Sequence, residues 1–286
     1  MIPNSDVPSN VPNFLDGCYH VYLDVGSNIG VQVRKLFEPE NYPLAKVHSI
    51  FNNNFGSIKE RRKAYLEGGR IVCAVGFEPN YRHTQYLEEI ERKYNSCGWR
   101  VIFLTESAVS DHDGTDTFFS DGKYSLNEHG GGILPPKINN KHSENFNDNS
   151  TNTKVTLIRL SDFLRNFVGK RVLPVLPSKK YPPRVLMKMD IEGSEIDVIP
   201  DLIFTGGLQY INGLMVEWHR RMEIDGKRNN THSILSKTLK LISEYSSVMK
   251  GHKPNFDFTS VTLDDETYHF HNQSSKLPQC EFNETA

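Results

Sequence analysis

A carboxylate and a glycine-containing turn follow the first apolar run of the chain, and together they could hold a nucleotide-like ligand. The run covers 21–25 and has Asp24 near its end. The residues singled out in the turn are Gly26, Ser27, Asn28 and Gly30. Such a turn lets the main chain approach a ligand closely. The simpler interpretation, an aspartate that caps the turn of an α/β protein, stays open.

This turn departs from the pattern of dinucleotide-binding proteins. The fingerprint G-x-G-x-x-G would need glycine in place of Asn28 and of Val31. A nicotinamide or flavin cofactor is therefore disfavoured, and a nicotinamide oxidoreductase ranks third among our hypotheses. A methionine-sulfonium ligand carries an ammonium group, so an acidic residue at this turn suits it better than it suits a pyrophosphate.

A second carboxylate, Glu78, follows the apolar run at 71–77 and precedes Pro79 and a helical pattern. An ionised carboxylate can accept two hydrogen bonds from a ribose diol, although an acid is also common at a helix start. Ser107 and Ala108 follow a third run, and they are a weaker indication of contacts to an adenine edge.

Charged residues alternate at the end of the fourth apolar run, which covers 185–191. Lys188, Asp190 and Glu192 would share one face if the chain stayed extended, and Gly193 then permits a sharp turn. Charges at the end of an apolar strand are costly unless they serve a site. A buried ion pair between Lys188 and Asp190 is the alternative.

Glu217 and His219 lie at the end of the fifth run, on either side of Trp218. Asp190, Glu217 or His219 could each take a proton from an acceptor hydroxyl. His219 could equally be a satisfied histidine of the core or surface. The pair His269 and His271 has spacing compatible with a metal but no third ligand nearby, so we expect no metal site there.

The five runs alternate with helical patterns, which predicts an α/β fold with a mainly parallel sheet and ligands at the carboxyl ends of its strands. Alternation at 256–263 and 268–271 predicts an antiparallel hairpin at the sheet edge. We expect one domain over 1–286, interrupted at about 39–69 and 120–154. The second interruption is polar, and it is either a lid over the acceptor side or a disordered loop.

Composition excludes several classes of protein. The 286 residues carry 33 Lys and Arg against 35 Asp and Glu, so no broad basic field is available for nucleic acid. No run of about 18 apolar residues indicates a membrane segment, and the chain is expected to be soluble and cytoplasmic as written. The four cysteines show neither CxxC spacing nor the density of a disulfide scaffold, so they leave the compartment open.

Taken together, five segments resemble the FkbM-type methyltransferases, a branch of the S-adenosylmethionine-dependent Rossmann-like superfamily. They span residues 22 to 219 and read YLDVGSNIGVQVRKLFEP, VGFEPNYRH, ESAVSDHDG, LMKMDIEGSE and LMVEWH. The long insertion at 39–69, with its FNNNFG segment, is closer to eukaryotic members, some of which methylate sugar hydroxyls of glycans in the secretory pathway. The lumen of that pathway, including the Golgi, is thus the alternative compartment if an N-terminal anchor was trimmed.

The resemblance implies a seven-stranded sheet whose last strand is reversed, and it implies roles for the residues above. The turn from Asp24 to Gly30 is assigned to the methionine moiety and Glu78 to the ribose, with Pro79, Ser107, Ala108 and Asp190 also on the cofactor side. The resemblance places Asp190, Glu192 and His219 on the acceptor side. The candidate catalytic residues are Asp190, His219, Glu217 and Lys188.

The leading hypothesis for function is transfer of a methyl group from S-adenosylmethionine to a hydroxyl of a small molecule or glycan. N-methylation stays open, as does a metal-assisted route in which Asp190 and its neighbours hold a divalent cation. A non-catalytic protein that binds S-adenosylmethionine, or a scaffold, is the alternative from another class.

Overall fold

The computed structural model describes most of the chain, namely residues 13–66, 72–119, 132–133, 152–175, 182–219, 231–248 and 256–260. Its strands are β1 (His20–Val25), β2 (Val72–Glu78), β3 (Arg100–Thr105), β4 (Ser107–Ser110), β5 (Gly114–Phe119), β6 (Asn152–Arg159), β7 (Val185–Met189), β8 (Gly213–Val216) and β9 (Asp257–Ser260). Its α-helices are α1 (Val31–Phe37), α2 (Val47–Phe55), α3 (Ile58–Leu66), α4 (Tyr81–Ser96), α5 (Leu160–Phe163), α6 (Glu195–Phe204) and α7 (Thr231–Val248). Shorter helical turns are η1 (Pro39–Asn41), η3 (Leu164–Val168) and η4 (Gly207–Tyr210).

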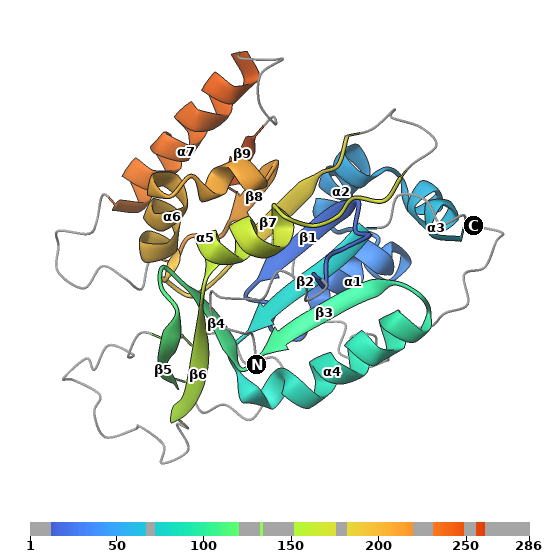
Figure 1. Ribbon diagram of the computed structural model, residues 1–286, viewed down its shortest axis with the longest axis horizontal. Helices are drawn as coiled ribbons and strands as arrows, with labels where there is room; N and C mark the ends of the chain where they lie inside the picture. The colour runs from blue at the N-terminus through green and yellow to red at the C-terminus, as the bar shows by residue number, and fades with distance from the viewer. Residues whose placement is uncertain are drawn as a thin grey trace.

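Six strands of the described chain form one sheet in the order β3-β2-β1-β7-β8-β9, and every neighbouring pair is parallel. The five predicted strands are therefore confirmed, with β7 ending at Met189, two residues before the predicted limit of 191. The chain order reverses between β1 and β7, so the carboxyl ends of these two strands flank the switch point where ligands of such sheets bind. Figure 1 shows the sheet crossing the centre of the molecule.

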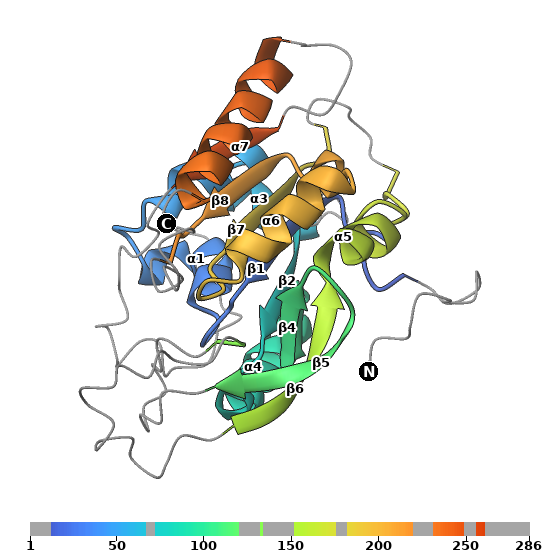
Figure 2. The ribbon, with the colours of Figure 1, turned by 90° about the vertical axis from the view of Figure 1, so that its left-hand side faces the viewer.

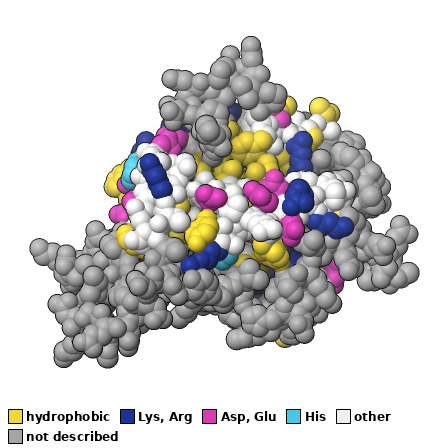
Figure 3. All heavy atoms as spheres, turned by 90° about the horizontal axis from the view of Figure 1, so that it is seen from below, with side chains coloured by type: hydrophobic (Ala, Val, Ile, Leu, Met, Phe, Trp, Pro, Cys, Tyr) yellow, Lys and Arg dark blue, Asp and Glu magenta, His cyan; other side chains and the backbone are white. Residues whose placement is uncertain are grey.

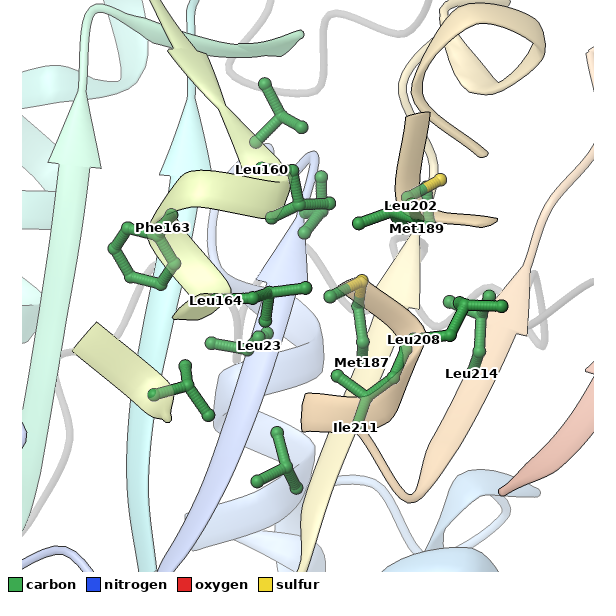
Figure 4. Packing of buried hydrophobic residues seen from close by; sticks show 14 of the residues in the cluster. Leu23, Leu160, Phe163, Leu164, Met187, Met189, Leu202, Leu208, Ile211 and Leu214 are labelled. Atoms are coloured by element: carbon green, nitrogen blue, oxygen red, sulfur yellow. The ribbon is translucent and has the colours of Figure 1, made fainter. Parts of the chain in front are cut away.

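Both faces of the sheet are covered by helices, because both sets of alternating side chains on its inner strands are apolar. One face packs against α5, α6 and α7, and the other packs against α1, α2 and α4 (Figure 2). In Figure 4, Leu23, Met187 and Leu214 of three adjacent strands face Leu164 of η3 and Leu208 of η4, which lie on the same side of the sheet as α5 and α6. The sheet is thus held rigidly on both sides, which fixes the ends of its strands.

A smaller sheet, in the order β4-β6-β5, was not predicted from the sequence. Strand β6 is parallel to β4 and antiparallel to β5. The predicted interruption at about 120–154 lies largely outside the described residues, and β6 begins just before its predicted end, at Asn152. Strands β5 and β6 lie on either side of this segment, and Phe119 pairs with Gly132 within it.

The interruption at 39–69 is mostly helical where the structure describes it. Helix α2 buries Val47, Phe51 and Phe55 against the side of the sheet that carries Tyr22, so it belongs to the same core as α1. Arg61 of α3 is buried, and its guanidinium donates to the main-chain oxygens of Leu36 and Gly56. This segment is therefore part of the fold around the first helix.

The predicted hairpin at the sheet edge is not confirmed. Strand β9 occupies the edge, but it runs parallel to β8, and the second predicted strand at 268–271 lies outside the described residues together with His269 and His271. The expected count of seven strands is not confirmed either, since six are described in the main sheet.

A disulfide bond joins Cys18, just before β1, to Cys73 of β2. Both side chains are buried, and Cys97 at the end of α4 is disulfide-bonded too. The cysteine spacing gave no sign of these bonds, because the bond between Cys18 and Cys73 depends on two adjacent parallel strands whose sequence positions are 55 residues apart. None of the helices among the described residues has the length and apolar character needed to cross a bilayer.

Candidate active site

The turn between β1 and α1 is held by glycines at positions that other residues would strain. Gly26 has a φ of +84°, and a Cβ atom there would lie 1.8 Å from the main-chain oxygen of Asp190. Gly30 has a φ of +75° and precedes α1. The close approach of Gly26 to Asp190 brings the turn after β1 against the end of β7.

The carboxylate of Glu78 is tied to this turn from the neighbouring strand. The main-chain N–H of Asn28 donates to its Oε2 at 2.6 Å, and the N–H of Asn80 donates to its Oε1 at 2.9 Å. Nδ1 of His83 lies 3.4 Å from the same Oε1. Each carboxylate oxygen has two acceptor sites, so these contacts leave room for a further donor.

Asp24 is fully buried at the end of β1, and neither of its carboxylate oxygens has a hydrogen-bond partner among the described residues. The Ser27 hydroxyl donates to the main-chain oxygen of Asp24 instead. Burial raises the pKa of Asp24 to about 6, and the nearby positive charge of Lys188 opposes the rise. An unsatisfied carboxylate of this kind is expected where a charged ligand binds.

Lys188 links the turn to the end of β7. Its Nζ donates to the main-chain oxygen of Gly26 at 3.1 Å and to Oδ2 of Asp190 at 2.7 Å. Burial opposes its charge, but the carboxylates of Asp190 and Asp24 outweigh burial and raise the pKa of Lys188. The alternative of a buried pair between Lys188 and Asp190 is therefore observed, although Asp190 itself is about a quarter exposed.

His219 lies among three carboxylates. Its Nδ1 is 2.9 Å from Oε1 of Glu195, and its Nε2 is 3.3 Å from Oδ1 of Asp190 and 3.8 Å from Oε1 of Glu192. Burial lowers the pKa of His219, but the hydrogen bond and charge of Glu195, followed by the other two carboxylates, raise it to about 9. The imidazole therefore carries a proton at neutral pH in the ligand-free chain.

The expectation that Lys188, Asp190 and Glu192 share one extended face was wrong. Strand β7 ends at Met189, and Glu192 has a φ of +53° in the turn that follows. Asp190 and Glu192 nevertheless both face Nε2 of His219, at 3.3 Å and 3.8 Å.

Glu195, the first residue of α6, is a site residue that the sequence-based assignment omitted. It is fully buried, and its Oε1 accepts from the main-chain N–H of Ile191 as well as facing Nδ1 of His219. The motif K-x-D-x-E-G-x-E contained the signal, since its last glutamate is Glu195. A buried carboxylate in a helix start next to two other acids indicates a partner from elsewhere in the fold.

The remaining predicted residues lie at the ends of other elements of the two sheets. Glu217 follows β8, and its main-chain N–H donates to the oxygen of Met189 at 2.9 Å. Ser107 and Ala108 lie in β4 of the small sheet, where Ser107 Oγ donates to the oxygen of Thr105 and Ala108 is buried. Pro79 joins Glu78 to the cap of α4. The catalytic role of Glu217 and the cofactor-binding roles of Ser107, Ala108 and Pro79 stay predictions from the sequence.

Figure 3 looks at the molecule from below Figure 1, the side toward which the arrowheads of β2 and β3 point. Acidic and basic side chains are interspersed over the described part of this face, with hydrophobic side chains between them. No broad patch of Lys and Arg is visible on that part, in agreement with the net charge of −2.

The fold is compatible with a Rossmann-like methyltransferase. It is an α/β fold with a mostly parallel sheet, a glycine turn after the first strand and acidic residues at successive strand ends. The chain matches the family of the methyltransferase FkbM domain over residues 24–268, most of its length. It belongs to this family of methyltransferases. A comparison with curated proteins and a comparison with solved structures give no match.

Proposed function

We propose that this chain is an S-adenosylmethionine-dependent O-methyltransferase whose acceptor is a hydroxyl of a small molecule or a glycan. The observation that carries the proposal is that Asp24, buried without a hydrogen-bond partner among the described residues, lies near the end of a strand adjacent to the one that ends in Glu78. Asp24 offers a carboxylate whose oxygens accept no hydrogen bond from the described residues, and Glu78 offers its remaining acceptor sites beside a glycine turn.

The residues of this chain fit the cofactor in two respects. The carboxylate of Asp24 suits the ammonium of the methionine moiety, because ionisation of a buried acid is favoured by a cation that binds beside it. The acceptor sites that remain on Glu78 suit the two donors of a ribose diol. Gly26 and Gly30 both adopt positive φ values at the two ends of the turn, which lets its main chain bend tightly beside the strand ends.

S-Adenosylmethionine, when bound, supplies an electrophilic methyl group on its sulfonium. Lys188 holds Asp190 through Oδ2, so Oδ1 is left toward His219. Asp190 and His219 thereby lie at the carboxyl ends of β7 and β8, where an acceptor can approach. We expect these two residues to orient the acceptor hydroxyl and handle its proton, and the positioning itself supplies much of the rate enhancement.

The choice of oxygen as acceptor atom rests on this acidic environment. Carboxylates accept hydrogen bonds from hydroxyl groups, and several carboxylates close together suit the polyhydroxyl surface of a sugar. An N-methyltransferase remains the alternative within the same chemistry, and a non-catalytic binding protein is the alternative outside it. The cluster around His219 favours catalysis over simple binding, because such charges are costly unless a site uses them.

The disulfide between Cys18 and Cys73 supports the lumen of the secretory pathway over the cytoplasm as the place of action. Disulfides form and persist in oxidising compartments and are rare in reducing ones. Many glycan hydroxyl groups are exposed in that lumen. Trapping of free thiols in the protein inside cells, followed by electrophoresis without reductant, measures whether the bond forms there.

The experiment that tests the function has two parts. Calorimetric titration with S-adenosylhomocysteine measures cofactor binding, and we expect one site per chain. Transfer of labelled methyl groups from S-adenosylmethionine to a panel of glycosides and free amines then measures the acceptor class. Binding without transfer to any compound would favour the non-catalytic alternative, and the absence of binding would contradict the proposal.

A further inference from the structure

Three donor groups at the carboxyl ends of β7 and β8 converge closely enough to share one ion. The ligand atoms of Asp190, Glu192 and His219 all lie within 4.8 Å of one another. Two ligands at neighbouring positions around a metal are about 3 Å apart when the bonds to the metal are about 2.2 Å. The distances of 3.3 Å and 3.8 Å from Nε2 of His219 to Asp190 and Glu192 are close to that separation.

A carboxylate on the second ring nitrogen orients the imidazole of His219, as is usual for histidines that bind a metal ion. Its Nδ1 faces Oε1 of Glu195 at 2.9 Å, so Nε2 is the nitrogen left toward Asp190 and Glu192. A carboxylate on the far nitrogen fixes the ring and makes the coordinating nitrogen more basic. Glu195 is not one of the three converging donors, so its contact is a separate observation.

The carboxylate of Glu195 accepts hydrogen bonds from the described residues at only one of its two oxygens. It is fully buried, and its Oε2 has no hydrogen-bond partner among the described residues. Asp190 Oδ2 is occupied by Lys188, which leaves Oδ1 on the side of His219. Three carboxylates around one protonated imidazole leave an excess of negative charge, and a divalent cation that displaces the proton from Nε2 would offset that excess.

We propose that Asp190, Glu192 and Nε2 of His219 bind a divalent cation such as Mn²⁺. Two carboxylate oxygens and one imidazole nitrogen form a mixed donor set that suits such ions, and their side chains are 17% to 24% exposed, so the site is open to solvent. The remaining coordination positions can take water or the acceptor oxygens. Binding of the cation stands independently of the proposed function, whereas its catalytic use, lowering the pKa of the acceptor hydroxyl, rests on that function.

The test is a titration of the full chain, freed of metal by a chelator and free of cofactor, with Mn²⁺. The paramagnetic resonance signal of free Mn²⁺ falls as the ion binds. We expect one site per chain, with binding weakened at least about tenfold in Glu192→Gln and in Glu195→Gln. His112→Ala is the matched control, since His112 also faces an aspartate, Asp111, at 2.6 Å but lies outside this cluster. Its affinity should equal that of the parent chain.

Circular dichroism and binding of S-adenosylhomocysteine show whether each variant is folded. One Mn²⁺ site that is lost in folded Glu192→Gln and kept in His112→Ala supports the proposal. Absence of binding at millimolar Mn²⁺, or equal affinity in the parent chain and folded Glu192→Gln, overturns it. Should Glu192→Gln be unfolded, Glu195→Gln decides in the same way. Because the cofactor is titrated separately, failure of the metal site and failure of the cofactor site are told apart.

Discussion

The main-chain N–H of Asn28 donates a hydrogen bond of 2.6 Å to the carboxylate of Glu78, and this bond joins the turn after the first strand to the end of the second. Asn28 has a φ of +50° in that turn. A hydrogen bond from a backbone amide to a charged carboxylate is stronger than one between neutral groups. Glu78 therefore both shapes the turn and presents its remaining acceptor sites beside it.

The first prediction concerns this double role. Glu78→Ala removes the charged acceptor, and we expect the affinity for S-adenosylhomocysteine to fall by at least about tenfold, or about 1.5 to 3 kcal/mol. Isothermal calorimetry measures the change. Glu88→Ala, at an exposed position on α4, is the matched control and should bind as the parent chain does. Unchanged affinity in folded Glu78→Ala would reject the role of Glu78 in cofactor binding.

The second prediction follows from the raised pKa of Asp24. The folded chain holds the proton of Asp24 more tightly than the unfolded chain, because burial raises the pKa from its ordinary 3.8 to about 6. The ionised carboxylate therefore costs stability above pH 6, and this cost disappears as the pH falls below 3.8. Asp24→Asn should thus raise the free energy of unfolding of the ligand-free chain at pH 8, by about 1 to 3 kcal/mol.

Urea unfolding at pH 8 and at pH 4.5 measures this effect, and the difference between Asp24→Asn and the parent chain should shrink at the lower pH. The same variant should bind S-adenosylhomocysteine more weakly at pH 8, since it lacks the charge that faces the ammonium. A variant that is less stable than the parent at pH 8 would contradict the assignment of Asp24 as an unsatisfied carboxylate.

The third prediction concerns Gly26. Alanine there would need a positive φ, which costs roughly 1 to 2 kcal/mol, and its Cβ would meet the main-chain oxygen of Asp190 at 1.8 Å. We expect Gly26→Ala to lower the free energy of unfolding by about 2 kcal/mol or more and to weaken cofactor binding. Gly114→Ala is the control, because a Cβ there meets nothing closer than 3.9 Å. Equal melting temperatures for the two variants would show that the close approach is unimportant.

The fourth prediction concerns the bond between Cys18 and Cys73. A disulfide that spans 55 residues stabilises the folded state by about 4 kcal/mol if its effect is to restrict the unfolded chain. The double variant Cys18→Ala with Cys73→Ala should lose stability of this order in urea unfolding. Its unfolding should still respond to reductant, because Cys97 is disulfide-bonded as well. Unchanged stability in the double variant would contradict a stabilising role for the first bond.

The sequence predicted the carboxyl ends of β1 and β2 to within one residue, because the apolar runs at 21–25 and 71–77 are buried and lead directly into Gly26 and Glu78. It placed the end of β7 two residues too late. It could not predict the contact between Glu195 and His219, which depends on how α6 packs beside β8. Nor could it predict the small sheet, since β4 and β6 are separated in sequence by β5 and the segment after it. Local patterns locate elements, whereas contacts between distant elements depend on the packing of the whole fold.

The last prediction concerns catalysis. Asp190→Asn keeps the shape of the side chain but removes its charge from between Lys188 and His219, and His219→Ala removes the imidazole. Both changes act where the acceptor hydroxyl is expected, and they leave the carboxylates of Asp24 and Glu78 in place. We therefore expect kcat to fall by about 10² to 10⁴ in each variant while the affinity for S-adenosylhomocysteine changes little. His112→Ala, a surface histidine paired with an aspartate, should keep the parent rate. Methyl transfer at the parent rate in both Asp190→Asn and His219→Ala would move the catalytic centre away from the ends of β7 and β8.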